Sequence, residues 1–144
     1  MTTHSSGRYS LTYLYSVPDD AWYVELDEVD GLRQLAIGIV PDEDPAREPT
    51  VCFDTRGGER HIPYDVLRWF MKAVDEEIRT SRAWMELRPD LVELIHALRQ
   101  EDLGVIDDDD LPPVLARLRA TLPEADLAVV MRHAYGRGPD GGIL

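Results

Sequence analysis

Residues 22–39 read WYVELDEVDGLRQLAIGI, and this stretch decides the fold of the first half of the chain. From Trp22 to Leu26, apolar and polar residues alternate with a period of two, which is typical of a half-buried strand. The Asp30-Gly31 pair that follows is a strong signal for a tight hairpin, because a type I′ turn needs a positive φ at both central residues. The stretch therefore predicts two antiparallel strands joined by that turn.

A turn centred on Asp30-Gly31 also predicts which residues lie opposite one another. The expected pairs are Val29 with Leu32, Glu28 with Arg33, Leu26 with Leu35, Val24 with Ile37 and Trp22 with Ile39. In every pair but one, an apolar side chain meets an apolar one, and the remaining pair joins opposite charges. A slip of one residue would turn one strand over and lose these matches.

The segment before this hairpin alternates in the same way. Tyr9–Val17 is expected as a strand, Pro18-Asp19-Asp20 as a turn, and the same test pairs Val17 with Trp22, Tyr15 with Val24 and Tyr13 with Leu26. After the second hairpin, the proline-rich residues 41–49 are expected as a loop, Val51–Asp54 as a fourth strand and Glu59–Ile62 as a short fifth strand. The two hairpins agree on one buried face.

Helical spacing replaces the alternation after Pro63. One long amphipathic helix carries Leu67, Phe70, Met71, Val74 and Ile78, and it is the natural cover for the apolar sheet face. Three further helices are expected over Pro89–Gln100, over Leu111–Leu122 with Asp109 or Asp110 as its cap, and from Pro123 to a stop at Gly136.

Strands first and helices second predict the α+β class. We expect an N-terminal antiparallel β-meander of four or five strands with one face covered by a long helix, followed by a C-terminal helical region of about three helices. The chain is expected to form a single domain over residues 1–144, with 1–8 and 137–144 as loose ends. The pattern leaves open a helical subdomain over residues 80–136.

The charge balance narrows the classes of partner. Fifteen basic residues against 28 acidic ones give a net charge of −13, which argues against binding nucleic acid or an anionic lipid surface. All basic residues but Lys72 are Arg, which is typical of a GC-rich bacterial genome. The opening MTTHSSGR resembles no secretory signal and no apolar run is long enough for a membrane span, so we expect a cytoplasmic protein.

The acidic run Asp107–Asp110 invites a metal hypothesis, which its surroundings do not support. A calcium loop needs alternating oxygen ligands, a Gly at its sixth place and a Glu at its twelfth, whereas Leu111-Pro112-Pro113 follows here. The acidic residues 25–30 fail the same test, and His4, His96 and His133 share no ligand spacing with other residues. No metal and no cofactor are therefore expected, and the run is interpreted as a solvated loop at a helix N-terminus.

Cys52 and His61 form the one candidate catalytic pair. If the turn is centred between Arg56 and Gly57, Cys52 lies across from His61 and Asp54 across from Glu59, and a thiol beside an imidazole can become a thiolate nucleophile. If the turn is centred on Gly57-Gly58, His61 faces Asp54 instead, and Cys52 loses its partner. The ordinary interpretation of Cys52 is a small apolar residue buried in the core, and the RGG at 56–58 is ordinary turn chemistry.

The polar face of the sheet is the candidate for partner binding. Its candidate contact residues are Tyr23, Glu25, Asp27, Asp54 and Glu59, with Leu14, Gln34 and Ala36 beside them. The leading hypothesis is a small acidic bacterial protein, not an enzyme, that binds or inhibits a basic protein partner, as an immunity protein, an antitoxin or an accessory factor does. The alternatives are a small enzyme using Cys52 with His61, a ligand-binding module under the long helix, and an oligomer joined through the strand Tyr9–Val17. The oligomeric state itself is not predicted.

Overall fold

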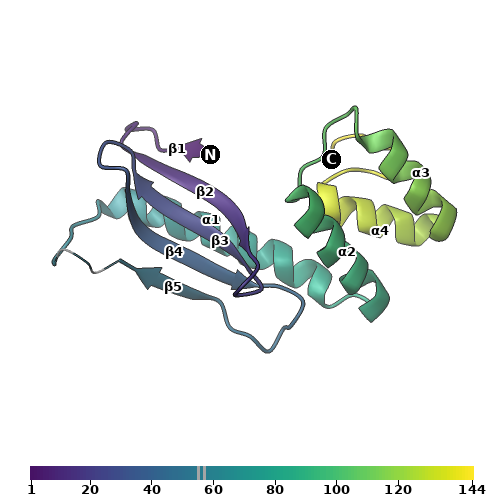
Figure 1. Cartoon of the computed structure of the whole chain (residues 1–144), viewed down its shortest axis with the longest axis horizontal. Helices are drawn as coiled ribbons and strands as arrows, with labels where there is room; N and C mark the ends of the chain where they lie inside the picture. Colours follow the sequence, from purple (N-terminus) through teal and green to yellow (C-terminus); the bar gives the residue numbers. More distant parts are fainter. Residues whose placement is uncertain (55, 57) are drawn as a thin grey trace. The chain divides into compact units, whose positions relative to one another are not determined.

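The computed structural model describes residues 1–54, 56 and 58–144, in which an antiparallel five-stranded sheet is followed by four helices (Figure 1). The strands lie in the order β1-β2-β3-β4-β5. Their bounds are Thr2–Thr3, Tyr9–Ser16, Ala21–Glu28, Arg33–Pro41 and Thr50–Phe53, and the helices α1 to α4 are Tyr64–Met85, Pro89–Asp102, Leu111–Thr121 and Glu124–Tyr135. The predicted α+β class, an N-terminal meander with helices after it, is confirmed. None of the helices in the described residues is long and apolar enough to cross a membrane.

The chain divides into two compact units, Met1–Arg82 and Ala83–Leu144. The first holds the sheet and most of α1, and the second holds the last residues of α1 with α2, α3 and α4. Each unit has an apolar core of its own. Whether the second unit folds by itself, as the subdomain alternative for 80–136 supposes, stays a prediction.

The predicted register between β3 and β4 is correct at the turn and wrong beyond it. Glu28 pairs with Arg33, but a bulge between Leu26 and Asp27 moves every later pair by one residue, so that Leu26 faces Ala36 instead of Leu35. Leu35 and Ala36 are both buried, and the extra residue of the bulge lets both leave solvent. Sequence pairing by apolar matches could not show this, because it assumed an uninterrupted ladder.

The predicted type I′ turn at Asp30-Gly31 is also wrong. Neither Asp30 nor Gly31 has a positive φ, whereas Leu32 has a φ of 46° and its N–H contacts the carbonyl of Val29 at 3.3 Å. The connection is thus a four-residue loop with Leu32 in the left-handed region. Leu32 is 94% exposed, so no packing compensates for its conformation.

The β2–β3 hairpin keeps its predicted faces with a different register. Tyr15 lies opposite Trp22 and Tyr13 opposite Val24, two residues away from the prediction. A shift of two residues leaves each side chain on the same face of the sheet, because the side-chain period is two.

The sheet has one outer strand, β1, that was not predicted, and it lacks one strand that was predicted. Thr3, in the expected loose end 1–8, pairs with Ser10 as part of β1, whereas the expected strand Glu59–Ile62 is not a strand. After β5, the Asp54 carboxylate accepts a hydrogen bond from the Arg56 N–H at 2.9 Å. The question of whether the turn is centred before or on Gly57 concerns a residue outside the described part of the chain.

Helix α1 covers one face of the sheet, as predicted. Val66, Phe70 and Val74 of α1 pack on Trp22, Val24, Leu26 and other core residues of the strands. Met71 was expected in this stripe but is 39% exposed, since the buried side of the helix is centred on Phe70 and Val74. The helix comes so close to β4 that a Cβ on Gly38 would lie 2.5 Å from Cγ2 of Val74.

The second unit is built around Trp84, Ile95, Leu127 and Met131, all fully buried. Helix α4 ends at Gly136, as predicted, with a φ of 65°. The residues after it were expected to be loose, yet Arg137 forms a β-bridge with Ile143, and its Nη1 donates to the Asp108 carboxylate at 2.9 Å. Arg137 thereby connects residues 137–143 to the acidic loop 107–110.

Candidate functional site: the open face of the sheet

The face of the sheet away from α1 carries the candidate site. Alternation along the strands and the observed pairing define this side, which we call the open face. Its central residues are Ser10, Thr12, Leu14, Tyr23, Glu25, Asp27, Gln34, Ile37, Ile39, Thr50 and Cys52. In Figure 1, α1 lies behind the sheet and the open face is toward the viewer. None of the described helices of the first unit covers it.

Tyr23, Glu25 and Asp27 follow one another on β3, and all three are half-buried. Their cross-strand neighbours separate the face into two zones. Tyr23 lies between Leu14 and Ile39, so one zone is an apolar row across three strands, whereas Asp27 lies between Ser10 and Gln34 in a polar zone. Glu25, between Thr12 and Ile37, stands where the two zones meet.

The surroundings of the two carboxylates disfavour their charged forms. Burial raises the pKa of Glu25, the charge of Asp27 raises it further, and a hydrogen bond with Gln34 opposes the rise. Burial also raises the pKa of Asp27. Both groups would therefore gain from a cation placed against them, since an opposite charge favours the ionised form.

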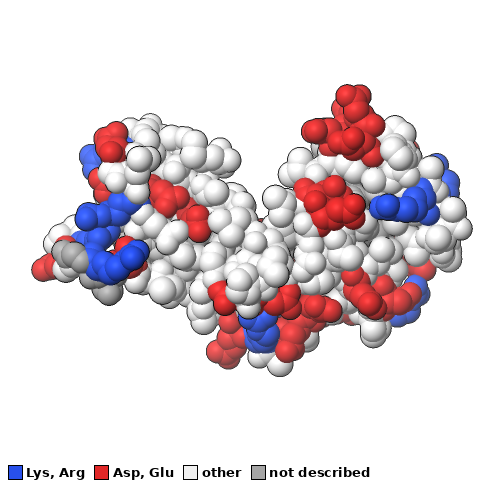
Figure 2. All heavy atoms as spheres, viewed as in Figure 1, with Lys and Arg blue, Asp and Glu red and all other residues white. Residues whose placement is uncertain are grey.

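Figure 2 shows how charge is arranged on this side of the molecule. Over the sheet, acidic side chains are set in a largely uncharged surface, and basic side chains gather at the end where β4 begins and β5 ends. Arg33 and Arg56 are the exposed cations of those segments. Acidic residues outnumber basic ones in both units, so the negative charge is not confined to the open face.

Three residues predicted for this face lie elsewhere or make other contacts. Ala36 is on the covered face, where it pairs with Leu26 and is 1% exposed, because of the bulge. Asp54 follows the end of β5 and accepts hydrogen bonds from the Arg56 guanidinium, which lower its pKa. Glu59 is in the following loop, where its Oε1 lies 3.1 Å from Nε2 of His61.

The strand pairing that would place Cys52 opposite His61 does not form. Cys52 pairs with Ile37 of β4, and its hairpin partner strand is not formed. Cys52 lines a hollow of about 260 Å³ together with Gln34, Ala36, Ile37, Phe53, Asp54 and Arg56, a set that does not include His61. Cys52 is exposed, which corrects the interpretation as a buried apolar residue. Catalysis by this pair stays a prediction.

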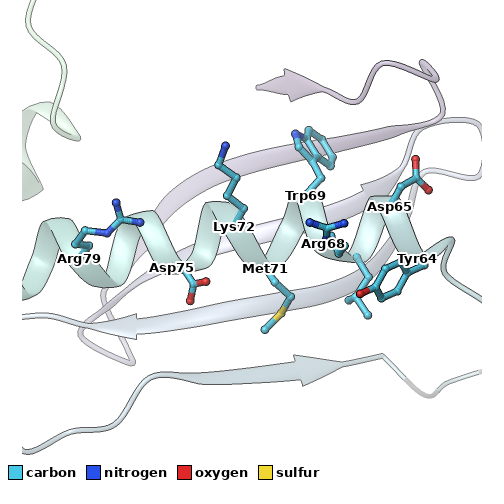
Figure 3. Close-up of a pocket in the computed structure, with 9 residues that line it drawn as sticks. Tyr64, Asp65, Arg68, Trp69, Met71, Lys72, Asp75 and Arg79 are labelled. Atoms are coloured by element: carbon cyan, nitrogen blue, oxygen red, sulfur yellow. The ribbon is translucent and has the colours of Figure 1, made fainter.

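A larger hollow of about 620 Å³ lies along α1 (Figure 3). All of its lining residues belong to this helix, from Tyr64 to Arg79, and most of them are exposed. The Arg68 guanidinium stacks over the Tyr64 ring at 5.8 Å. The hollow is thus on the outside of the helix, whereas the ligand-binding alternative placed its site beneath it.

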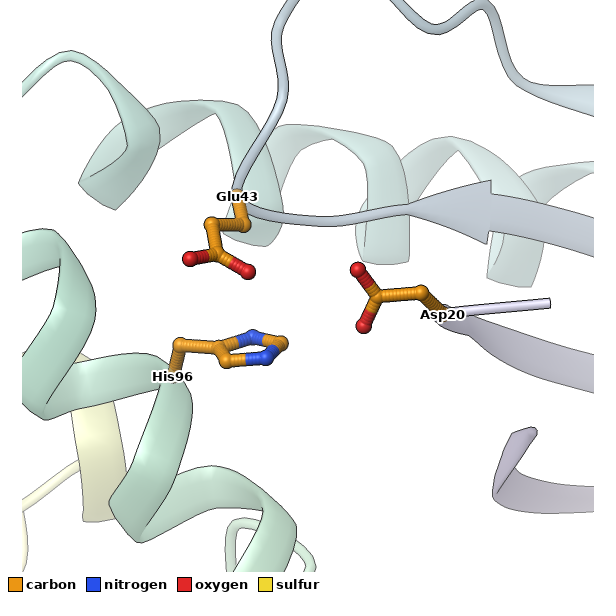
Figure 4. A group of neighbouring side chains, drawn as sticks. All are labelled: Asp20, Glu43 and His96. Carbon is orange, nitrogen blue, oxygen red and sulfur yellow. The ribbon is translucent and has the colours of Figure 1, made fainter. Parts of the chain in front are cut away.

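Two carboxylates outside the open face come close together. Asp20 and Glu43, both in the first unit, have oxygens within 4.8 Å of each other. Figure 4 draws them with His96, which belongs to α2 in the second unit. The Asp20 carboxylate also accepts a hydrogen bond from the Tyr15 hydroxyl. Two carboxylates supply fewer oxygens than Ca²⁺ or Mg²⁺ needs, so we assign no metal site to them.

Two other histidines have contacts that the sequence did not reveal. His4 packs on the Trp69 ring, with 5.0 Å between centroids, and its Nε2 lies 3.5 Å from the Asp65 carboxylate. It therefore attaches the N-terminal residues to α1. Burial lowers the pKa of His133, as do Arg132 and Arg99, against the favourable position near a helix C-terminus that the sequence indicated.

No family model matches this chain, and no match was found among the curated proteins or the solved structures.

Proposed function

We propose that this protein is an interaction module that docks a basic protein surface on its open face. The observation that carries the proposal is the placement of Glu25 and Asp27. They lie two residues apart on a central strand of an uncovered face, are partly buried, and have raised pKa values. A surface of Arg or Lys side chains would relieve this destabilisation and would be steered to the face by its charge.

The apolar row beside the carboxylates supports a protein partner over a free cation. Leu14, Tyr23 and Ile39 are half-buried and adjacent, so they offer contact area that a partner could cover. Interfaces combine such an apolar centre with charged surroundings. The partner is thus a folded protein that presents an apolar side chain next to Arg or Lys.

The proposed bacterial origin, cellular location and inhibitory role rest on the amino-acid composition. The Arg-rich, acidic composition favours a bacterial cytoplasmic protein, and blocking a basic toxin or nuclease, as immunity proteins and antitoxins do, suits a net charge of −13. An enzymatic role is not part of the proposal. A small enzyme that uses Cys52 with His61 remains the alternative, and fast labelling of Cys52 near neutral pH by a thiol probe would favour it.

The test is capture from a GC-rich bacterial lysate with charge-matched variants. The variant Glu25→Lys/Asp27→Lys changes the open face, and Asp107→Lys/Asp109→Lys makes the same change of net charge on an exposed loop of the second unit. A specific partner should be retained by the wild type and by the loop variant at moderate salt, and lost with the open-face variant. Equal loss with both variants, or the absence of any basic protein among those retained, would contradict the proposal.

A further inference from the structure

Strand β5 forms an outer edge of the sheet and pairs only with β4 among the described strands. Its four residues, Thr50–Phe53, carry no charge and include no proline. Three of them are exposed, and Phe53 is 48% exposed. An uncharged outer strand of this kind is a template for pairing with another strand, and most proteins protect such edges with a charge or a proline.

The backbone of β5 has groups that point away from β4 and pair with no other strand in the described residues. The Asp54 N–H donates to the carbonyl of Leu35 at 3.0 Å, so Asp54 faces β4. Because hydrogen-bonding direction alternates along an antiparallel ladder, Cys52 also faces β4, whereas Val51 and Phe53 direct their N–H and C=O groups outward. The outer edge thus offers two donors and two acceptors in an alternating order.

We propose that a second copy of this chain pairs with β5 in antiparallel orientation, with Cys52 of each copy on the two-fold axis. Val51 then lies opposite Phe53 of the second copy, and this pair occurs twice, so that all four outward groups of each edge are satisfied. Val51 and Phe53 pair with Gly38 and Ala36, so both side chains lie on the covered side, where the exposed Phe53 ring gains an apolar neighbour.

The choice of a second copy rests on self-complementarity. In an isologous two-fold contact, the same strand of both copies meets itself, so the residues that lie opposite each other must be compatible. Here apolar Val51 meets apolar Phe53, and Cys52 meets itself without charge repulsion. At each end of the pairing, Glu48 precedes one strand and Arg56 follows the other, so exposed charges of opposite sign are brought toward each other. The contact avoids Glu25 and Asp27, which would repel their copies.

The two-fold axis would stand perpendicular to the sheet and leave both open faces on one side. The dimer would therefore present two docking surfaces in one continuous sheet, which goes beyond the function proposed above. Pairing across the axis also has a chemical signature. Residues opposite each other in a non-hydrogen-bonded pair have Cα atoms about 4.5 Å apart, within the range that a disulfide bridges.

The experiment measures the mass of the full chain under reducing conditions and then its crosslinking under mild oxidation. We expect twice the chain mass of 16.3 kDa by light scattering over a wide range of concentration, and rapid formation of a Cys52–Cys52 crosslink. The matched control is Thr50→Cys in a Cys52→Ser background, because Thr50 lies on the same strand and face and is also exposed. In the proposed register Thr50 lies opposite Asp54, so the control should crosslink at least about tenfold more slowly, since its two thiols are too far apart to bridge.

Two variants address the edge directly. Phe53→Pro removes an outward N–H and no bond to β4, and Cys52→Asp places two carboxylates on the axis. Each should give a monomer with an unchanged circular dichroism spectrum, and the exposed Cys52→Asp serves if the proline variant does not fold. A monomeric wild type, equal crosslinking by the Thr50 control, or a dimer that persists in the folded Cys52→Asp variant would overturn the proposal.

Discussion

The contact between Gly38 and Val74 yields the sharpest prediction about the fold. A Cβ at position 38 would lie 2.5 Å from Cγ2 and 3.2 Å from Cγ1 of Val74, whereas ordinary contacts begin near 3.4 Å. Val74 is β-branched and held in one rotamer on α1, so it cannot turn aside. We expect Gly38→Ala to force the helix outward and to cost about 1–3 kcal/mol, reduced by about 0.4–1 kcal/mol because alanine restricts the unfolded chain. With the middle of each range, the net loss should be about 1.3 kcal/mol.

The assay is urea unfolding followed by circular dichroism. Val74→Ala removes both interfering methyl groups, so the double variant Gly38→Ala/Val74→Ala should be less destabilised than the sum of the single variants by about 1 kcal/mol or more. The matched control is Gly31→Ala, whose Cβ would meet its nearest neighbour at 3.7 Å. Wild-type stability for Gly38→Ala, or strict additivity in the cycle, would refute the close approach of α1 to β4.

Three further predictions address the turn, the open face and the second unit. Gly31→Ala should be neutral or slightly stabilising, and Leu32→Gly should stabilise the chain by about 0.5–1 kcal/mol in urea unfolding, because Leu32 and not Gly31 has the positive φ; a type I′ turn would give a loss for Gly31→Ala. Glu25→Gln/Asp27→Asn should raise the free energy of unfolding at neutral pH by a few tenths of a kcal/mol, measured by urea unfolding. Both pKa values are raised in the folded state, so the folded protein binds more protons and loses stability as pH rises through them. The gain should disappear at acid pH, where the carboxyl groups are protonated in both states, and a gain that grows on acidification would contradict the raised pKa values. Tyr135→Phe should destabilise the second unit by about 0.5–1.5 kcal/mol, because the Tyr135 hydroxyl donates to the Asp102 carboxylate at 2.8 Å. Urea unfolding followed by circular dichroism measures this loss, and an unchanged midpoint would show that the bond contributes nothing.

Local patterns predicted the elements of this fold better than its registers. The alternation from Trp22 to Leu26 and the helical spacing from Leu67 onward depend on which residues are apolar, and both survive in the structure. The bulge after Leu26 does not follow from such a pattern, since it arises because Leu35 and Ala36 both find space in the core. Trp84 was not assigned to a core from the sequence, because its neighbours in space come from α2 and α4.

The part of the candidate site that lies on the single strand β3 was predicted from the sequence. Tyr23, Glu25 and Asp27 alternate on β3, so their common face followed from the period of two. The prediction for Asp54 and Glu59 depended on a second hairpin that does not form, and the hydrogen bonds from Arg56 to the Asp54 carboxylate do not follow from an RGG turn signal. The position of β5 at the edge of the described sheet likewise did not follow from the sequence, because the expected strand Glu59–Ile62 does not form.

The most direct test of the docking role is the affinity of a purified captured partner for the two charge-matched variants, measured by isothermal titration calorimetry. The open-face proposal predicts that Glu25→Lys/Asp27→Lys weakens binding by at least about tenfold, or about 1.4 kcal/mol, while Asp107→Lys/Asp109→Lys stays close to the wild type. Equal affinities of the wild type and the open-face variant would contradict the proposal and show that the partner binds elsewhere.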